Sequence, residues 1–342
     1  MAPEPSFKTE LVATHTPELF DRAVAAAAAV LRRGGLVALP TETVYGLACN
    51  ALNPDAVAEI FRVKGRPSNN PIIVHISDVE MARQCVAEWP VVADRLASAF
   101  WPGPLTLVLR RSVMIPDIVT AGGRTVGIRQ PAHPIIQAVI RACGFPLAAP
   151  SANLSTRLSP TNARHVFDQL GGRIPLVLDG GQCNVGIEST VLDISAQPAR
   201  ILRPGMIHEP ALLPITGRLG QSSAGAGPPR SPGMLSKHYS PKAGLVVRSW
   251  RDDHDLLQLA ASLGQPSNAV AVLAHTIVPG AASFRRVSIL PKDAGAYARG
   301  LYLELHECDT CGANLIIVET PPEGPKWQAA HDRLARAAHV AT

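Results

Sequence analysis

Short apolar segments alternate with helical segments along the first 213 residues, and this alternation constrains the fold more than any other feature. A helical segment begins at Thr16-Pro17, where a hydroxyl cap precedes proline, and ends at Gly34-Gly35. The strand-like segment LVALP (36–40) follows directly, and a second helical segment occupies 55–64. This pattern predicts an open, largely buried α/β sheet. Further strand-like segments are PIIVHI (71–76), LTLVLR (105–110), TVGIR (125–129), PLAAPS (146–151), LVLD (176–179), TVLDI (190–194) and RILR (200–203).

The composition changes after residue 213. The segment 216–241 is rich in glycine, serine and proline and poor in apolar residues, which is typical of a linker. Apolar and helical segments alternate again beyond it. We therefore predict three parts: a larger α/β domain over 1–213, a linker over 214–242, and a smaller α/β domain over 243–342.

Composition and missing motifs exclude several classes of protein. The 342-residue chain has a formal charge of +5, which suits an anionic ligand or partner, and no apolar run long enough to span a bilayer. Without a secretory signal, we expect a cytosolic protein with reduced cysteines and no membrane partner. No P-loop, dinucleotide fingerprint or HExxH motif is present. The lone CxxC of Cys308 and Cys311 is interpreted as two reduced thiols, although His306 could add a third metal ligand.

Polar side chains gather where the predicted strands end. In an open α/β sheet, the loops outside the strand ends are where ligands bind. Cations combined with hydroxyls suit a polyphosphate, because positioning and charge stabilisation do most of the work in phosphoryl chemistry. The cations are Lys64, Arg66, Arg129 and Arg203, and the hydroxyls belong to Thr41, Thr43, Thr125, Ser151, Ser159, Ser189 and Thr190.

Simpler interpretations of the same residues remain open. A single arginine at a strand end is often a solvated surface residue, and His75 in an apolar strand could be a core histidine. The chain could also be a non-catalytic RNA-binding module that recognises tRNA by shape. Its many strand-end hydroxyls argue against that class, because binding to a phosphate backbone needs cations more than neutral groups.

Six motifs, taken in order, closely resemble the YrdC-like threonylcarbamoyl-AMP synthase family. They are PTETVYGL, KGRPSNNPIIVHI, WPGPLTLVL, VGIRQPAHP, PSANLS and GIESTVLD, and the HYSP at 238–241 resembles the longer two-domain form. The resemblance implies a twisted open mixed α/β sheet with a concave basic cavity, and a smaller C-terminal Rossmann-like domain. It also implies a nucleotidyltransferase that makes threonylcarbamoyl-AMP and pyrophosphate from L-threonine, bicarbonate or CO2, and ATP. The partner would be a complex that transfers the group to tRNA beside the anticodon, with tRNA contact left open.

The same resemblance assigns residues to roles. Lys64 and Arg66 correspond to the family's catalytic KxR. Threonine contacts are implied for Thr43, His75, Arg129, Ala149 and Ser189. Nucleotide contacts are implied for Arg66, Asn70, Thr125, Ser151, Asn153, Ser159, Arg203 and Tyr239.

Three further expectations follow for the site. Mg²⁺ should accompany ATP, with its protein ligands unknown. The side chains of Lys64 and Arg66 should lie outside the core. Tyr239 should form part of a linker that closes over the nucleotide, the alternative being that its ring packs against the second domain. A carbamoyl-phosphate-using maturation factor is disfavoured, because no zinc-finger cysteine pairs or acylphosphatase-like segment precede the first domain.

Overall fold

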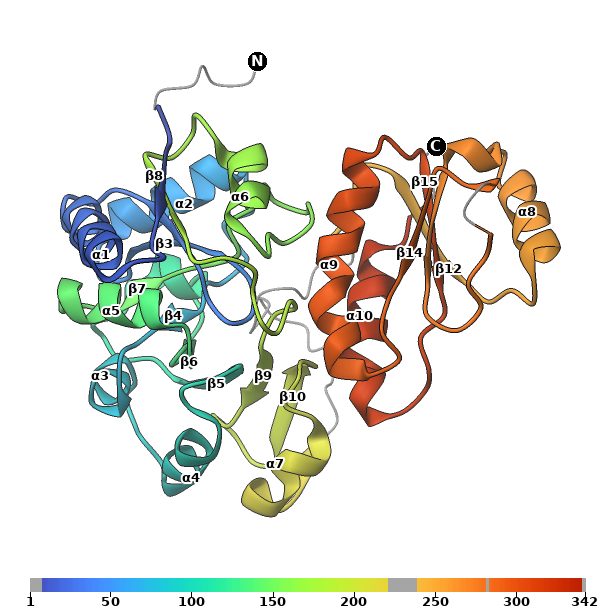
Figure 1. Ribbon diagram of the computed structural model, residues 1–342. Coiled ribbons are helices and arrows are strands. Elements are labelled where there is room, and N and C mark those ends of the chain that lie inside the picture. Colours follow the sequence, from blue (N-terminus) through green and yellow to red (C-terminus); the bar gives the residue numbers. More distant parts are fainter. Residues whose placement is uncertain (1–7, 221–238, 281–282, 340–342) are drawn as a thin grey trace. The chain divides into compact units, whose positions relative to one another are not determined.

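The computed structural model describes residues 8–220, 239–280 and 283–339. The chain divides into two compact units (Figure 1). Most of the first 220 residues form the first unit. The second unit contains the rest of the described chain together with two short segments, Thr156–Ser159 and Val185–Ile187.

The first unit is built around an 11-stranded mixed sheet with the strand order β1-β8-β2-β3-β7-β4-β6-β5-β9-β10-β11. This confirms the predicted mixed α/β architecture. The strands are β1 (Glu10–Ala13), β2 (Val37–Leu39), β3 (Gly46–Asn50), β4 (Val74–His75), β5 (Leu105–Arg110), β6 (Thr125–Arg129), β7 (Leu147–Ala148), β8 (Leu176–Asp179), β9 (Thr190–Asp193), β10 (Ala199–Arg203) and β11 (Leu219–Gly220). The helices are α1 (Pro17–Arg32), α2 (Pro54–Lys64), α3 (Val79–Cys85), α4 (Val91–Phe100), α5 (Pro134–Cys143), α6 (Ala163–Leu170) and α7 (Glu209–Thr216), with a 3₁₀ turn η1 (Asp117–Thr120).

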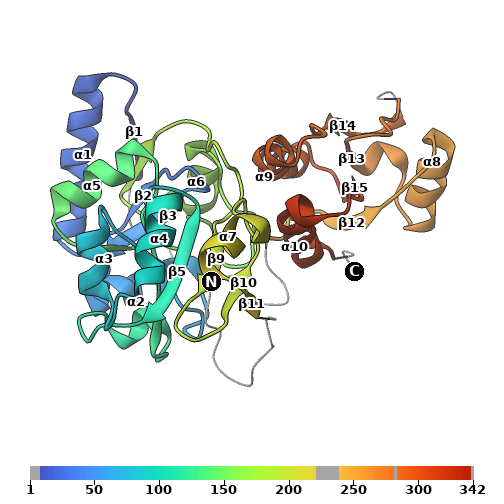
Figure 2. The same cartoon turned by 90° about the horizontal axis from the view of Figure 1, so that it is seen from below.

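Helices cover both faces of the central strands, which explains why these strands are apolar at consecutive positions. Val37 and Leu39 of β2 pack in one cluster with α1 and α5, which lie side by side in both views (Figures 1 and 2). Ala38, between them, belongs to a second cluster with α2, α4 and α6. Successive residues of a strand therefore point into different hydrophobic cores.

Local signals place several helix ends where the sequence predicts them. Thr16 caps α1, since its side chain accepts a hydrogen bond from the amide of Leu19. At its other end, α2 stops at Gly65, whose φ of 60° is the left-handed conformation that favours glycine. Lys64 is therefore the last helical residue, and Arg66 begins the loop that leads towards β4.

The second unit is a smaller three-layered α/β domain. Its four-stranded parallel sheet has the order β12-β15-β13-β14. Helices α9 and α10 cover one face and α8 covers the other (Figures 1 and 2). The elements are β12 (Gly244–Arg248), α8 (Asp253–Ser262), η2 (Ser267–Ala269), β13 (Val270–Ala274), β14 (Arg286–Ile289), α9 (Ala294–Thr310), β15 (Leu315–Glu319), η4 (Pro325–Trp327) and α10 (Gln328–Ala337).

Several elements differ from the sequence prediction. The strands β1, β3 and β11 lie outside the segments expected to be strands, and the strand expected over 146–151 is reduced to Leu147–Ala148. The strand expected over 71–76 is reduced to Val74–His75. The linker expected from residue 214 begins inside α7, and β11 follows at 219–220; residues 221–238 of that segment lie outside the described residues. Within the described ranges, no helix has the length and apolar character needed to cross a membrane.

Candidate functional site

The Lys64 cluster, defined here as Lys64, Arg66, Asn70, Ser151 and Asn153, lies where α2 ends. The Nζ of Lys64 donates to the carbonyl of Ser151 at 2.5 Å and to the carbonyl of Asn153. Lys64 is only 2% exposed, so the expectation that it lies outside the core is wrong. Burial lowers the pKa of Lys64 well below its usual value, and the neighbouring Arg66 lowers it further.

Arg66 is also buried, which corrects the same expectation for the second cation. Its Nε donates to the carbonyl of Asn70 at 3.2 Å, and its Nη2 donates to the carbonyl of Pro71 at 2.8 Å. These contacts, with the amide of Ile72 donating to Val119, occupy the backbone where the strand was expected to begin. Arg66 therefore holds the loop that precedes β4.

The side-chain amide of Asn70 is buried without hydrogen-bond partners. Its residue is 1% exposed, and neither Oδ1 nor Nδ2 has a partner among the described residues. Leaving a buried donor or acceptor unpaired costs about 1–3 kcal/mol. Both atoms are thus available to a polar ligand beside Arg66.

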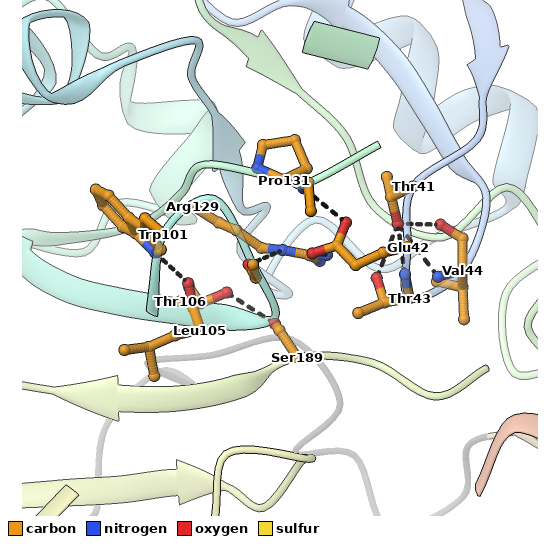
Figure 3. A network of polar contacts seen from close by, with 12 residues as sticks. Thr41, Glu42, Thr43, Val44, Trp101, Leu105, Thr106, Arg129, Pro131 and Ser189 are labelled. Atoms are coloured by element: carbon orange, nitrogen blue, oxygen red, sulfur yellow. Dashed lines mark hydrogen bonds and ion pairs between the residues drawn. The ribbon is translucent and has the colours of Figure 1, made fainter. Parts of the chain in front are cut away.

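A second group of polar residues is called here the Arg129 cluster: Glu42, Thr43, Arg129 and Ser189, which Figure 3 labels, together with His75. Arg129 ends β6, and its Nη2 lies 2.7 Å from Oε1 of Glu42. Its Nε donates to the carbonyl of Gly103 at 3.2 Å. The other oxygen of Glu42, Oε2, accepts from the amide of Ala132 at 3.0 Å. Arg129 and Glu42 therefore form a buried ion pair, and each of the two side chains also bonds to a backbone group.

A tight turn positions Thr43 beside this pair. The hydroxyl of Thr41 donates to the carbonyl of Val44 at 2.7 Å and accepts from the amides of Thr43 and Val44 (Figure 3). The Thr41 and Thr43 hydroxyls are 2.8 Å apart. This local hydrogen bonding fixes the segment between β2 and β3 without regular secondary structure.

Ser189 connects the strands β5, β9 and β10 through its polar contacts. It immediately precedes β9, and its hydroxyl lies 2.8 Å from that of Thr106 on β5. Arg203, at the end of β10, donates through Nη2 to the same hydroxyl and through Nε to the Ser189 carbonyl, both at 3.1 Å. The predicted residues Ser189 and Arg203 are therefore in direct contact.

His75 lies next to Arg129 in the sheet. The two residues are paired in register across β4 and β6. Burial, reinforced by the positive charge of Arg129, lowers the pKa of His75 to about 3, so the imidazole is neutral near pH 7. Its Nδ1 is buried and has no hydrogen-bond partner in the described chain, while the backbone of Ile73 accepts from the ring and partly opposes the lowering of its pKa.

The segment after β7 connects the two clusters. Its first residue, Ala149, donates from its amide to the carbonyl of Ile73, just before β4. Ala152 then pairs with Tyr45, and Ser151 forms a bridge with Gly46 at the start of β3. The two carbonyls that bind Lys64 therefore belong to a segment that also runs beside Thr43 and His75.

Comparison with protein families identifies the chain. Residues 29–205 match the Sua5_yciO_yrdC family, described as "Telomere recombination". Residues 204–339 match the family described as "Threonylcarbamoyl-AMP synthase, C-terminal domain". The chain belongs to the two-domain threonylcarbamoyl-AMP synthase family, and it is an enzyme.

Relatives of this family match nearly the whole chain. The threonylcarbamoyl-AMP synthase of Bacillus subtilis is 40% identical, with 96% of this chain and 95% of the relative covered. That of Pyrococcus abyssi is 39% identical, with 91% and 92% covered. Crystallised P. abyssi Sua5 bound to L-threonine has a TM-score of 0.85 at 37% identity, and a doubly substituted form has 0.87 at 35%; each comparison covers 96% of both chains. The resemblance found in the sequence is confirmed.

Three further predicted site residues belong to neither cluster. Thr125 begins β6, at the opposite end of that strand from Arg129. Ser159 and Tyr239 belong to the second unit. The ring of Tyr239 is buried there, 5.8 Å from the ring of Tyr302 and 5.3 Å from the guanidinium carbon of Arg333, which is the packing arrangement considered as the alternative to a lid. A nucleotide contact by these three residues stays a prediction.

Sequence reasoning missed Glu42 and Thr106. Both lie inside motifs that were noticed, PTETVYGL and WPGPLTLVL, yet neither was assigned a role. The signal for Glu42 was an acid between two threonines at the end of a buried strand, where a charge needs a partner. Thr106 carried no signal, because a threonine in β5 is ordinary strand composition.

The cysteines carry no site in the described structure. All six are free thiols, and burial raises the pKa of Cys308. His306, the suggested third ligand, directs Nε2 to the carbonyl of Ser159 at 3.1 Å. No group of three or more His, Cys, Asp or Glu side chains suited to a metal ion occurs among the described residues. The interpretation of the CxxC as two reduced thiols stays a prediction.

Proposed function

We propose that this enzyme joins L-threonine, bicarbonate or CO2, and ATP to form threonylcarbamoyl-AMP and pyrophosphate. The proposal rests on one observation above all: residues 149–153 bind the buried Lys64 through two carbonyls and also pair with Gly46 and Ile73, close in sequence to Thr43 and His75 of the Arg129 cluster, which holds a buried arginine–glutamate pair. The Lys64 cluster suits phosphate groups, and the Arg129 cluster suits an amino acid. The relatives' names and the L-threonine complex of P. abyssi Sua5 support the same assignment.

The Arg129 cluster would bind threonine. Arg129 already uses Nε and Nη2, so its Nη1 is the end that would reach the substrate carboxylate. The hydroxyls of Thr43 and Ser189 can pair with the hydroxyl of threonine, which helps to reject valine. Ala149 would line the pocket beside the neutral His75.

The Lys64 cluster would bind the phosphates. The ammonium of threonine first loses a proton. The free amine then captures CO2 with loss of a second proton, or bicarbonate with loss of water, to form a carbamate. A carbamate oxygen attacks the α-phosphorus of ATP while pyrophosphate leaves. Negative charge increases on the phosphate oxygens during this step, and Lys64 and Arg66 would stabilise it. An anion beside Lys64 also favours its charged form, which opposes the effect of burial on its pKa.

Two further proposals concern ATP: the Mg²⁺ ion that accompanies it and the remaining residues that contact the nucleotide. Mg²⁺ would arrive with ATP and keep its waters, because the Lys64 cluster contains no carboxylate to hold it. No step is assigned to the ion. The nucleotide residues are Arg66, Asn70, Thr125, Ser151, Asn153, Ser159, Arg203 and Tyr239.

The product would be used in the cytoplasm. Threonylcarbamoyl-AMP is an activated acyl donor, and we propose that a tRNA-modifying complex transfers its threonylcarbamoyl group to the adenosine beside the anticodon. The RNA-binding alternative predicts no chemistry without RNA.

Mass spectrometry of the reaction product tests the proposal. Purified enzyme with ATP, bicarbonate and threonine, and no RNA, should form threonylcarbamoyl-AMP and release pyrophosphate only when all three substrates are present. Release of ADP and phosphate at a rate indifferent to threonine would overturn it.

A further inference from the structure

The Arg129 cluster contains a positive and a negative charge side by side. Arg129 supplies the first and Glu42 the second, and both side chains are less than one-tenth exposed. Burying such a pair usually stabilises a protein less than packing apolar residues in its place. A role in ligand recognition would explain why Arg129 and Glu42 form this pair just where β6 and β2 end.

Glu42 retains capacity to accept hydrogen bonds. Oε1 lies 2.7 Å from Arg129, but the N–H is not aligned for a hydrogen bond, and Oε1 has no other partner in the described chain. Oε2 accepts one bond, from the amide of Ala132. Since each carboxylate oxygen can accept two bonds, a ligand's donor can be added at either oxygen.

The neighbouring groups are compatible with a cation at this point. His75 stays uncharged because burial and Arg129 hold its pKa near 3, so it does not repel an ammonium group. Its Nδ1, buried and without a partner, is a second group that can pair with a ligand there. Thr43 adds a neutral hydroxyl.

We propose that Glu42 is a specificity-determining residue that pairs with the substrate's ammonium group, so that the Arg129 cluster selects a zwitterionic α-amino acid. Arg129 takes the carboxylate of the same molecule. This inference rests on the proposed function, since it concerns how threonine is recognised. The competing role for Glu42 is to hold Arg129 in place without touching the ligand.

Two ligands separate these roles. L-Threonine and (R)-3-hydroxybutyrate share the carboxylate, the hydroxyl and the methyl group, but only threonine has the ammonium. Calorimetric titration of both ligands against wild-type enzyme and Glu42→Gln gives four affinities. Glutamine keeps the shape of glutamate and removes its charge.

The proposal expects the wild-type enzyme to bind threonine about ten- to a hundredfold more tightly than the hydroxy acid, as for one hydrogen bond to a charged group. Glu42→Gln should lose most of that preference by weakening threonine alone. An equal loss for both ligands would show that Glu42 only positions Arg129, and would overturn the proposal.

Two controls protect the result. Glu59→Gln removes an acid from an ion pair with Arg62 that is more exposed, and it should leave both affinities unchanged. Glu188→Gln tests the buried acid beside Ser189; loss of the preference in that variant alone would assign the ammonium to Glu188 and overturn the role of Glu42.

The wild-type titrations can overturn the proposal even where Glu42→Gln does not fold. Equal wild-type affinity for threonine and (R)-3-hydroxybutyrate would mean that the ammonium is not recognised, which overturns the proposal. Threonine binding with this preference, but without formation of threonylcarbamoyl-AMP, would instead contradict the proposed function and leave the recognition of the amino acid standing.

Discussion

The Lys64 and Arg129 clusters bury their positive charges in different ways. Arg129 is paired with a carboxylate, whereas Nζ of Lys64 donates to two backbone carbonyls and to no acid in the described chain. Carbonyl dipoles hold a cation without neutralising it. The Lys64 cluster therefore keeps positive charge for an anion to balance, while the Arg129 cluster is balanced before a ligand arrives and suits one that carries both charges.

The largest expected effect comes from breaking the balanced pair. Arg129→Ala should lower the free energy of unfolding by about 3–5 kcal/mol, because it leaves Glu42 buried without its counter-charge. Urea denaturation measures the change. The double variant Arg129→Met, Glu42→Leu should recover most of the stability and still fail to bind threonine. A double variant as unstable as Arg129→Ala would show that packing, and not charge balance, governs this cluster.

Substitutions in the Lys64 cluster, where the lysine donates to two carbonyls and to no acid in the described chain, should affect turnover more than stability. Lys64→Ala and Arg66→Ala should each lower the rate of pyrophosphate release at least a hundredfold, about 2.7–4 kcal/mol for one lost stabilising group. Lys64→Ala should also lower the melting temperature, since the carbonyls of Ser151 and Asn153 lose their donor. Arg62→Ala, an exposed cation on the same helix, is the matched control. Unchanged turnover in both buried variants would remove the phosphate role from this cluster.

His75 offers a pH test of the balanced cluster. Its pKa is about 3 in the folded chain and near 6.5 unfolded, so between these values only the unfolded state binds the proton. Stability should therefore fall as the pH is lowered from 6.5 towards 3, by about 1.36 kcal/mol per unit for this one group. His75→Gln should lose that slope. Parallel curves for both proteins, measured by urea midpoints at several pH values, would contradict the assignment.

The smallest expected effect concerns Tyr239, in the second unit of the chain. Tyr239→Phe keeps the ring against Tyr302 and Arg333 and removes only the hydroxyl. If that hydroxyl contacts the nucleotide, the KM for ATP should rise by roughly two- to twelvefold, which corresponds to about 0.5–1.5 kcal/mol for one hydrogen bond, with the KM for threonine unchanged. An unchanged KM for ATP would leave Tyr239 as a packing residue only.

The sequence predicted those features that depend on neighbouring residues. The alternation of strands and helices, the cap at Thr16 and the helical segment ending at residue 64 were all evident from local patterns. The segments that form both clusters were also identified, because ligands of an open α/β sheet bind at the loops outside its strand ends.

Features that depend on distant parts of the chain were not predictable in this way. Lys64 is buried because carbonyls 87 and 89 residues further along the chain accept its Nζ. Glu42 acquires its role from Arg129, on a strand far away in sequence. A lysine beside a glycine looks like a surface residue until the partners that bury it are known.

The first strand of the protein has a consequence for its synthesis. β1 pairs with β8, and the hydroxyl of Thr9 bonds to a carbonyl 165 residues further along the chain. At 5–20 residues per second, a ribosome needs roughly 8–33 s to make that stretch. β2 and β3 can pair almost at once, whereas β1 must wait as an unpaired segment of the nascent chain. The order of translation therefore makes β1 wait longer for its partner than any other strand of this sheet and leaves it longest within reach of chaperones, although β9, β10 and β11 are made later.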